Sequence, residues 1–125
     1  MATALILDDS VKDAALAVSV LEKNNYSAAS TASIDLARSL VLALFFDVVV
    51  VDINIEAQSG VKGTDRGVAF ARRVRALHPR CHVILWGASS NHYDEAKAAG
   101  ASYVTKRAMV ESRLGEIIRE WKFQV

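Results

Sequence analysis

The sequence predicts an α/β fold in which helices cover both faces of a doubly wound parallel sheet. Short apolar runs alternate along the chain with longer segments in which apolar residues recur at helical spacing. Five such strand and helix pairs follow one another, and this alternation is the pattern of a parallel sheet flanked by helices. The 125 residues fit a single hydrophobic core, so we expect one domain over residues 1–125.

The expected strands are short runs of apolar or β-branched residues. The clearest is Asp47–Asp52, whose centre is four consecutive valines. Because a run without alternation is apolar on both faces, this strand is predicted to be central and parallel. Tyr26–Thr31 is a weaker candidate, since alanine and serine are poor strand formers. The other expected strands are Ala4–Leu7, His82–Trp86 and Ala101–Thr105.

Two helices are expected between the first three strands. In the first, the apolar residues that share a face are Val11, Ala14, Ala15, Val18 and Leu21. In the second, they are Ile34, Ala37, Leu40, Val41 and Leu44. Asp9 or Ser10 is expected to cap the first helix, and Thr31 or Ser33 the second. Asn24-Asn25 ends the first helix.

Three further helices are expected in the second half of the chain. The first of them, Gly67–Leu77, is stopped by Pro79. Its predicted inward residues are Val68, Ala71, Val74 and Leu77. Asn91–Ala99 is ended by Gly100, whose position suits the residue after a helix C-terminus. Ala108–Trp121 is predicted to be the last helix.

Composition and charge argue against several classes of function. The formal net charge of +1 gives no reason to expect binding to nucleic acid or to a membrane surface. No apolar run approaches the ~20 residues of a membrane span, and the N-terminus lacks the cationic start of a signal peptide. The single cysteine, Cys81, cannot form a disulfide within the chain and is typical of a reduced compartment. We therefore expect a cytoplasmic protein.

Charged residues stand where several of the predicted strands end. Asp8 and Asp9 follow the first strand, Asp52 ends the third and Lys106 follows the fifth. The ligand site of such a sheet lies outside the carboxyl ends of its strands, so these side chains are expected to converge. Converging carboxylates recruit a cation, and Mg²⁺ suits oxygen ligands. A carboxylate nucleophile, a metal and a lysine are the parts needed for phosphoryl transfer to an aspartate.

Three segments, in this order, resemble the receiver domain of two-component response regulators. Leu5–Ser10 resembles the first strand of that family with its acidic pair, and Val48–Asn54 resembles the strand that ends in the phosphoacceptor. Gly100–Lys106 resembles the fifth strand with its lysine. Nearly the whole chain takes part in the resemblance. It implies a flavodoxin-like domain with the strand order 2-1-3-4-5.

The resemblance also implies a role for each residue of this group. Asp9 would ligate Mg²⁺ (or Mn²⁺) directly, and Asp8 would do so mainly through water. Asp52 would be both a metal ligand and the phosphoacceptor, while Asn54 would ligate the metal through its backbone carbonyl. Lys106 would contact the phosphoryl group.

The fourth strand departs from the receiver pattern at Gly87. In receivers this position is Thr or Ser, whose hydroxyl binds the phosphoryl group and couples it to an aromatic side chain that rotates inward on activation. Tyr103 occupies that aromatic position here. Glycine has no hydroxyl, so the usual link between the phosphoryl group and Tyr103 is missing. Ser89 or Ser90 would replace it only if the backbone turned differently.

Two loops also depart from the pattern. Arg107 stands where a cis-proline usually follows the lysine, and a cis bond before a residue other than proline costs about 2.5–4 kcal/mol. A trans bond and a re-shaped last loop are therefore expected. The segment Ile53–Arg66 is predicted to be a loop, with Glu56 in place of the customary proline. Within it, Ala57–Arg66 is expected to contain an insertion of about seven residues beside the acidic cluster.

The leading functional interpretation is a receiver that takes a phosphoryl group from a histidine kinase or a histidine phosphotransfer protein. Its output would be protein contact, with a homodimer through the last helices as one form, and it would not be a turnover enzyme. The chain fits a stand-alone receiver and equally one excised from a hybrid kinase or a longer regulator.

Two other classes remain open. Gly87 and Arg107 favour a phosphorylation-independent interaction module that uses fixed surfaces. A small Mg²⁺-dependent phosphohydrolase would need a second aspartate two residues after its nucleophile, and Asn54 stands there.

Overall fold

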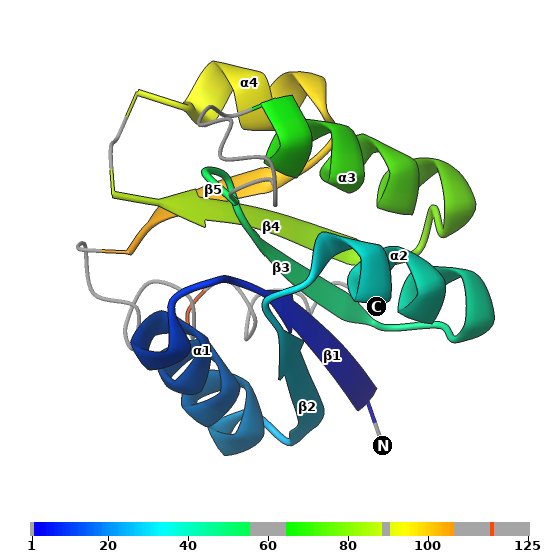
Figure 1. The fold of residues 1–125 in the computed structure, drawn as a ribbon, viewed down its shortest axis with the longest axis vertical. Helices are drawn as coiled ribbons and strands as arrows, with labels where there is room; N and C mark the ends of the chain where they lie inside the picture. Colours follow the sequence, from blue (N-terminus) through cyan, green and yellow to red (C-terminus); the bar gives the residue numbers. More distant parts are fainter. Residues whose placement is uncertain (1, 56–64, 89–90, 107–115, 117–125) are drawn as a thin grey trace.

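Five parallel strands form one sheet in the order β2-β1-β3-β4-β5, in a computed structural model that describes residues 2–55, 65–88, 91–106 and 116 (Figure 1). The strands are β1 (Ala2–Leu7), β2 (Tyr26–Thr31), β3 (Val48–Asp52), β4 (His82–Gly87) and β5 (Ser102–Thr105). The helices between them are α1 (Val11–Lys23), α2 (Ile34–Ala43), α3 (Asp65–Leu77) and α4 (Tyr93–Ala98). The predicted α/β fold and the strand order 2-1-3-4-5 are confirmed.

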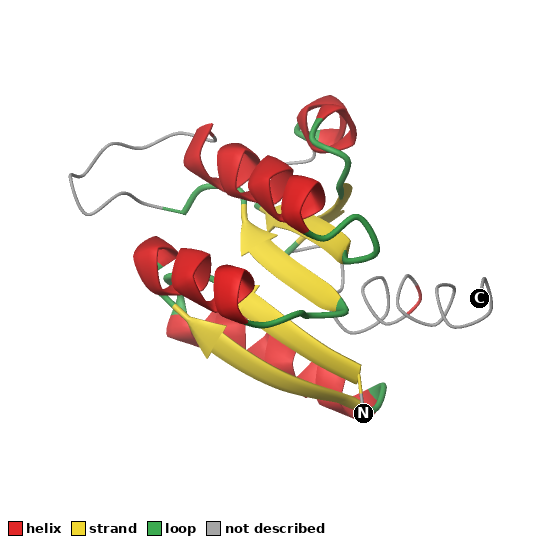
Figure 2. Ribbon diagram, turned by 90° about the vertical axis from the view of Figure 1, so that its right-hand side faces the viewer, coloured by secondary structure: helices red, strands yellow, loops and turns green. Residues whose placement is uncertain are grey.

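The core lies in two layers, one on each face of the sheet (Figure 2). On one face, Val49 and Val51 of β3 pack in a cluster with residues of α2, α3 and α4. On the other, Val48 and Val50 pack in a cluster with residues of α1. All five residues of β3 are buried, so the prediction of a central strand is confirmed. Alternate valines of one run therefore fill both layers, as expected for a strand that is buried on both faces.

Serine side chains fix where α1 and α2 begin. The Ser10 hydroxyl accepts a hydrogen bond from the Asp13 amide at 3.3 Å, and the Ser33 hydroxyl accepts one from the Leu36 amide at 3.1 Å. Each satisfies one amide that the first helical turn leaves without a partner. Of the alternative N-caps, Ser10 and Ser33 are therefore the ones used.

The predicted buried face of α1 was partly wrong. Val11 is 85% exposed, and Ala15 is also exposed. The buried residues of this helix are Ala14, Ala17, Val20 and Leu21. Three alanines at positions 14, 15 and 17 explain the error, because they leave the rotation of the helix about its axis undetermined by the apolar pattern.

Smaller corrections concern helix ends. Leu44 and Leu77 were expected to face the core, but both are exposed because they lie where α2 and α3 end. Phe70 was not predicted to be inward, yet it is buried in the layer under α3. The predicted loop Ile53–Arg66 was too long, since α3 already begins at Asp65. The predicted last helix, Ala108–Trp121, falls almost wholly outside the described residues.

No helix among the residues described is long and apolar enough to cross a membrane.

Candidate functional site

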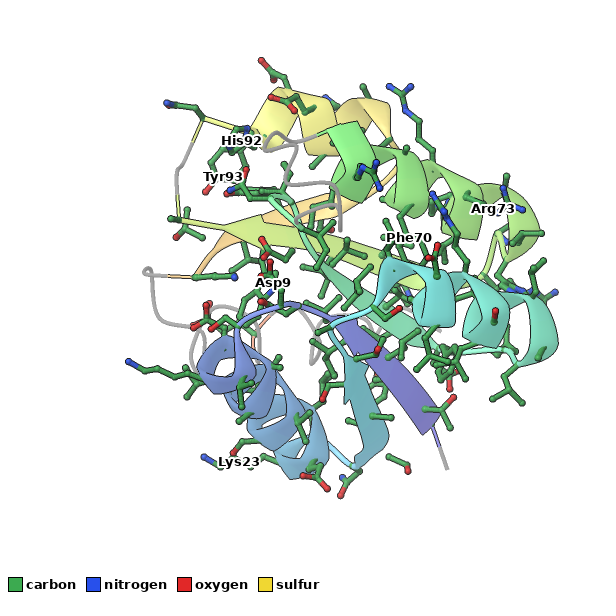
Figure 3. The ribbon with its side chains drawn as sticks, in the orientation of Figure 1. Asp9, Lys23, Phe70, Arg73, His92 and Tyr93 are labelled. Atoms are coloured by element: carbon green, nitrogen blue, oxygen red, sulfur yellow. The ribbon has the colours of Figure 1, made fainter. Side chains whose placement is uncertain are left out.

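The carboxyl ends of β1, β3, β4 and β5 meet at one edge of the sheet. Leu7 is registered opposite Val51, Asp52 opposite Trp86, and Gly87 opposite Thr105. Asp8 and Lys106 each follow a strand by one residue, so both enter the same space as Asp52. Figure 3 shows Asp9 at this edge, in the loop between β1 and α1.

Three carboxylates form a cluster there. One oxygen from each of Asp8, Asp9 and Asp52 lies within 4.8 Å of the others, with Asp8 and Asp52 buried and Asp9 exposed. Backbone amides orient the two buried groups. The Ser10 amide donates to Oδ1 of Asp8 at 2.8 Å, and the Asn54 amide donates to Oδ1 of Asp52 at 3.0 Å. In both residues Oδ2 is the oxygen that faces Lys106.

The ammonium of Lys106 lies among carboxylates from three elements. Its Nζ is 2.8 Å from Oδ2 of Asp8, 3.1 Å from Oδ2 of Asp13 and 3.5 Å from Oδ2 of Asp52. It also lies 5.1 Å from the ring centroid of Trp86, within the range of a cation–π contact. Burial alone would lower the pKa of Lys106, but the neighbouring carboxylates outweigh burial and raise it. The lysine therefore keeps its charge.

The pKa of Asp52 is raised to about 6, mainly because the carboxyl is buried. Lys106 and the Asn54 amide lower this pKa, whereas Asp8 and Asp9 raise it. At neutral pH the group is still mostly ionised, because the pH exceeds its pKa. The site thus presents a carboxylate whose charge is held among like charges and beside one cation, an arrangement common where chemistry takes place.

Beside this group, β4 ends in Gly87, which has no side chain, and neighbouring residues occupy the space next to it. A Cβ atom on Gly87 would lie 2.7 Å from Cγ2 of Ile53, 2.9 Å from the hydroxyl oxygen of Tyr103 and 3.7 Å from Nδ2 of Asn54. Real Cβ atoms essentially never show contacts under 3.0 Å. Tyr103 is buried and reaches across from β5, so its hydroxyl stands in the space that a Gly87 side chain would need.

The sequence profile of the response regulator receiver domain matches residues 4–119 of this chain. The chain belongs to this family. The match covers most of the molecule and confirms the resemblance that the strand-end residues indicated. Receiver domains are signalling modules in general rather than turnover enzymes. No curated protein matches the chain in sequence.

Solved structures of other receivers have the same fold. CheY4, a chemotaxis protein of Vibrio cholerae, is 24% identical, with a TM-score of 0.76 over 95% of this chain and 98% of that one. A response regulator from Burkholderia pseudomallei is 25% identical, with a TM-score of 0.74 over 99% of this chain and 72% of that one. TrrA from Thermotoga maritima is 21% identical, with a TM-score of 0.75 over 100% of both chains.

Two of these relatives have a ligand or a modification in their structures. The Burkholderia protein has a phosphorylated aspartic acid, a calcium ion and citrate. TrrA is in complex with Mg²⁺ and BeF.

Two contacts of this receiver site were not predicted. Asp13 pairs with Lys106, but an acidic residue in the first turn of a helix is ordinary, because it interacts favourably with the helix dipole. The sequence therefore carried no signal for it. Trp86 is buried beside Lys106, and only the approach of β4 to β5 brings the two together.

Two departures of this receiver from its family lie outside the residues that the structure describes. Arg107 is one of them. The other is the expected insertion, most of which falls in residues 56–64.

Proposed function

We propose that this chain is a phosphoacceptor receiver domain, in which Asp52 accepts a phosphoryl group from a histidine kinase or a histidine phosphotransfer protein. One observation carries the proposal. The carboxylate of Asp52 lies in a cluster with Asp8 and Asp9, and its Oδ2 is 3.5 Å from the ammonium of Lys106. The family supports a receiver role in general, and the arrangement of these four side chains supports Asp52 as the acceptor.

The same group of residues fits a divalent cation. Asp8, Asp9 and Asp52 offer carboxylate oxygens within 4.8 Å of one another, and such hard oxygen ligands suit Mg²⁺ or Mn²⁺. The backbone carbonyl of Asn54 would be a further ligand. When bound, the ion would neutralise charge on the carboxylates and on the transferred group. The Mg²⁺ and BeF complex of TrrA, a protein of the same fold, supports this choice of cation.

Asp52, the backbone amide of Asn54 and Lys106 each have a separate role in the transfer. The Asn54 amide holds Oδ1 of Asp52, so Oδ2 is the oxygen directed at the incoming phosphorus. Oδ2 would form the new P–O bond while the bond from phosphorus to the donor nitrogen breaks, and the donor imidazole keeps that electron pair and takes up a proton. Lys106 would contact an oxygen of the phosphoryl group as its charge is transferred.

Output through protein contact follows from this role, since a phosphorylated receiver acts by changing what its surface binds. A cytoplasmic location and one domain over residues 1–125 are part of the proposal.

Mass spectrometry with a small-molecule donor tests the proposal. The protein is incubated with acetyl phosphate and Mg²⁺, and its intact mass is compared with that of Asp52→Asn and of Asp35→Asn. Asp35 is a matched control because it is an exposed carboxylate that pairs with Arg38 at the surface of α2. A gain of one phosphoryl group is expected in the native protein and in Asp35→Asn but not in Asp52→Asn, and it should vanish when EDTA removes the metal.

The alternative is a receiver fold that works as a phosphorylation-independent interaction module. Gly87 favours it, because no hydroxyl from β4 is available to the phosphoryl group. Under this alternative, acetyl phosphate would add no mass and Mg²⁺ would leave the tryptophan fluorescence unchanged. The presence or absence of a phosphoryl adduct on Asp52 thus distinguishes the two functions.

A further inference from the structure

The hydroxyl of Tyr103 and the missing side chain of Gly87 occupy the same space. A Cβ atom at residue 87 would meet the Tyr103 hydroxyl oxygen at 2.9 Å and Cγ2 of Ile53 at 2.7 Å. A Thr or Ser at position 87 would therefore require the Tyr103 hydroxyl and the Ile53 side chain to shift. Conversely, glycine is what permits the tyrosine to lie inward. Gly87 departs from the receiver pattern, and the position of the Tyr103 hydroxyl depends on that departure.

Aromatic neighbours on the α4 side hold the Tyr103 ring in this position. The His92 ring packs edge-on with a centroid separation of 5.8 Å, and the Tyr93 ring packs edge-on at 5.2 Å. A contact of 3.0 Å between Nδ1 of His92 and Oε1 of Glu95 fixes His92 in turn. Figure 3 shows His92 and Tyr93 together where α4 begins. The ring is thus buried, with its hydroxyl beside Gly87.

The hydroxyl of Tyr103 lies at the carboxyl end of β4, which pairs with the strand that carries Asp52. Gly87, whose missing side chain it replaces, directly follows Trp86, which is registered opposite Asp52. Nδ2 of Asn54 lies 3.7 Å from the same point. Burial, Tyr93 and Asp52 raise the pKa of Tyr103, whereas Lys106 lowers it. The phenol therefore stays protonated and remains able to donate a hydrogen bond.

We infer that the Tyr103 hydroxyl donates to the phosphoryl group on Asp52, in place of the Thr or Ser hydroxyl that receivers carry at the end of the fourth strand. This inference rests on the proposed function of Asp52. It makes Tyr103 a phosphoryl-contacting residue that supplies the hydroxyl donor that Gly87 lacks. The hydroxyl of Tyr103, rather than its ring, is then the part that contacts the phosphoryl group.

Removal of one oxygen tests this role. In Tyr103→Phe the ring and its edge contacts remain, while the donor is lost. The matched control is Tyr93→Phe, which removes a hydroxyl from the neighbouring, exposed ring. Beryllofluoride, a mimic of the phosphoryl group, is titrated in the presence of saturating Mg²⁺ and followed by tryptophan fluorescence. Mg²⁺ alone is titrated in a separate series, and the intact mass after acetyl phosphate is recorded for each variant.

A hydrogen bond to a charged group contributes enough that its loss weakens binding by about tenfold to a hundredfold. We expect beryllofluoride to bind Tyr103→Phe that much more weakly, with Mg²⁺ affinity unchanged and with Tyr93→Phe equal to the native protein. Beryllofluoride affinity within twofold of native would overturn the inference, and so would an equal loss of Mg²⁺ affinity, which would indicate a merely structural role. Failure of the native protein itself to gain a phosphoryl group would instead refute the proposed function.

Discussion

The ammonium of Lys106 lies 3.1 Å from Oδ2 of Asp13, so the first turn of α1 is tied to the end of β5. This contact holds the lysine between Asp13 and Asp8, at a distance of 3.5 Å from Asp52. Asp13 therefore competes with the Asp52 carboxylate for the one cation that the described residues place within the cluster.

Asp13→Asn should lower the pKa of Asp52 below its native value of about 6. Two effects act in the same direction. The substitution removes a negative charge near the cluster, and it frees Lys106 to move toward Asp52, where its charge favours the ionised form. The measurement is a pH titration of the Asp52 side-chain carboxyl carbon by NMR, in the absence of divalent cations.

Asp35→Asn serves as the control for this titration, because Asp35 lies on the surface of α2 in a pair with Arg38. It should leave the Asp52 pKa at the native value. An Asp52 pKa that stays unchanged or rises in Asp13→Asn would show that Asp13 does not compete for the lysine.

The raised pKa of Asp52 also predicts how stability depends on pH. Below about pH 4 this carboxyl is protonated in both the folded and the unfolded chain. Between pH 4 and 6 the unfolded chain releases the proton while the folded protein retains it, so the free energy of unfolding falls as the pH rises. Above pH 6 the cost is constant, on the order of 2–3 kcal/mol from a shift of about two pKa units.

Asp52→Asn removes this cost, because an amide does not ionise and its oxygen can still accept from the Asn54 amide. The variant should unfold at higher urea concentration than the native protein at pH 7.5 in EDTA, and the advantage should shrink toward zero at pH 4. Urea titrations at the two pH values measure it. An advantage that is equal at both pH values would mean that ionisation of Asp52 is not its source.

The fold was predictable from the sequence where one residue pattern has one physical solution. Four consecutive valines favour a strand covered on both faces, and β3 is that strand. The convergence of Asp8, Asp52 and Lys106 at one edge was predictable as well, because parallel strands bring their carboxyl ends together. The rotation of α1 was predicted only in part, since its alanines fit either face equally well.

Contacts between side chains from distant segments were harder to predict. The absence of a hydroxyl at Gly87 was visible in the sequence, but that Tyr103 fills the space depends on how β5 and α4 pack. The Asp13 contact depends likewise on the angle at which α1 leaves β1. Such contacts follow from tertiary packing, which residue spacing within one segment does not determine.

Cys81 should react very slowly with thiol reagents in the folded protein. Burial raises the pKa of its thiol to about 12, with Arg75 lowering and Asp47 raising it further. Because the thiolate is the reactive form, a rise of about three units reduces its fraction about a thousandfold. At pH 8 we expect reaction with Ellman's reagent at least a hundredfold slower in buffer than in 8 M urea, with Cys81→Ser as the blank. Equal rates in buffer and urea would contradict a buried, inert thiol.

Gly67 allows α3 to approach the end of β3, and Gly67→Ala should therefore destabilise the protein. A Cβ there would lie 2.7 Å from the carbonyl oxygen of Asp52 and 2.9 Å from that of Ile53, and backbone atoms cannot yield as a flexible side chain can. Overpacking of this kind costs about 1–3 kcal/mol, whereas helix propensity alone would make alanine more stable by about 1 kcal/mol. Urea unfolding gives the sign, and Ala69→Gly, at an exposed position of α3, calibrates the propensity. Because the clash pushes on Asp52, the proposed phosphoacceptor, phosphorylation by acetyl phosphate should slow as well. A Gly67→Ala protein as stable as the native one would show that a Cβ atom at position 67 fits without displacing the end of β3.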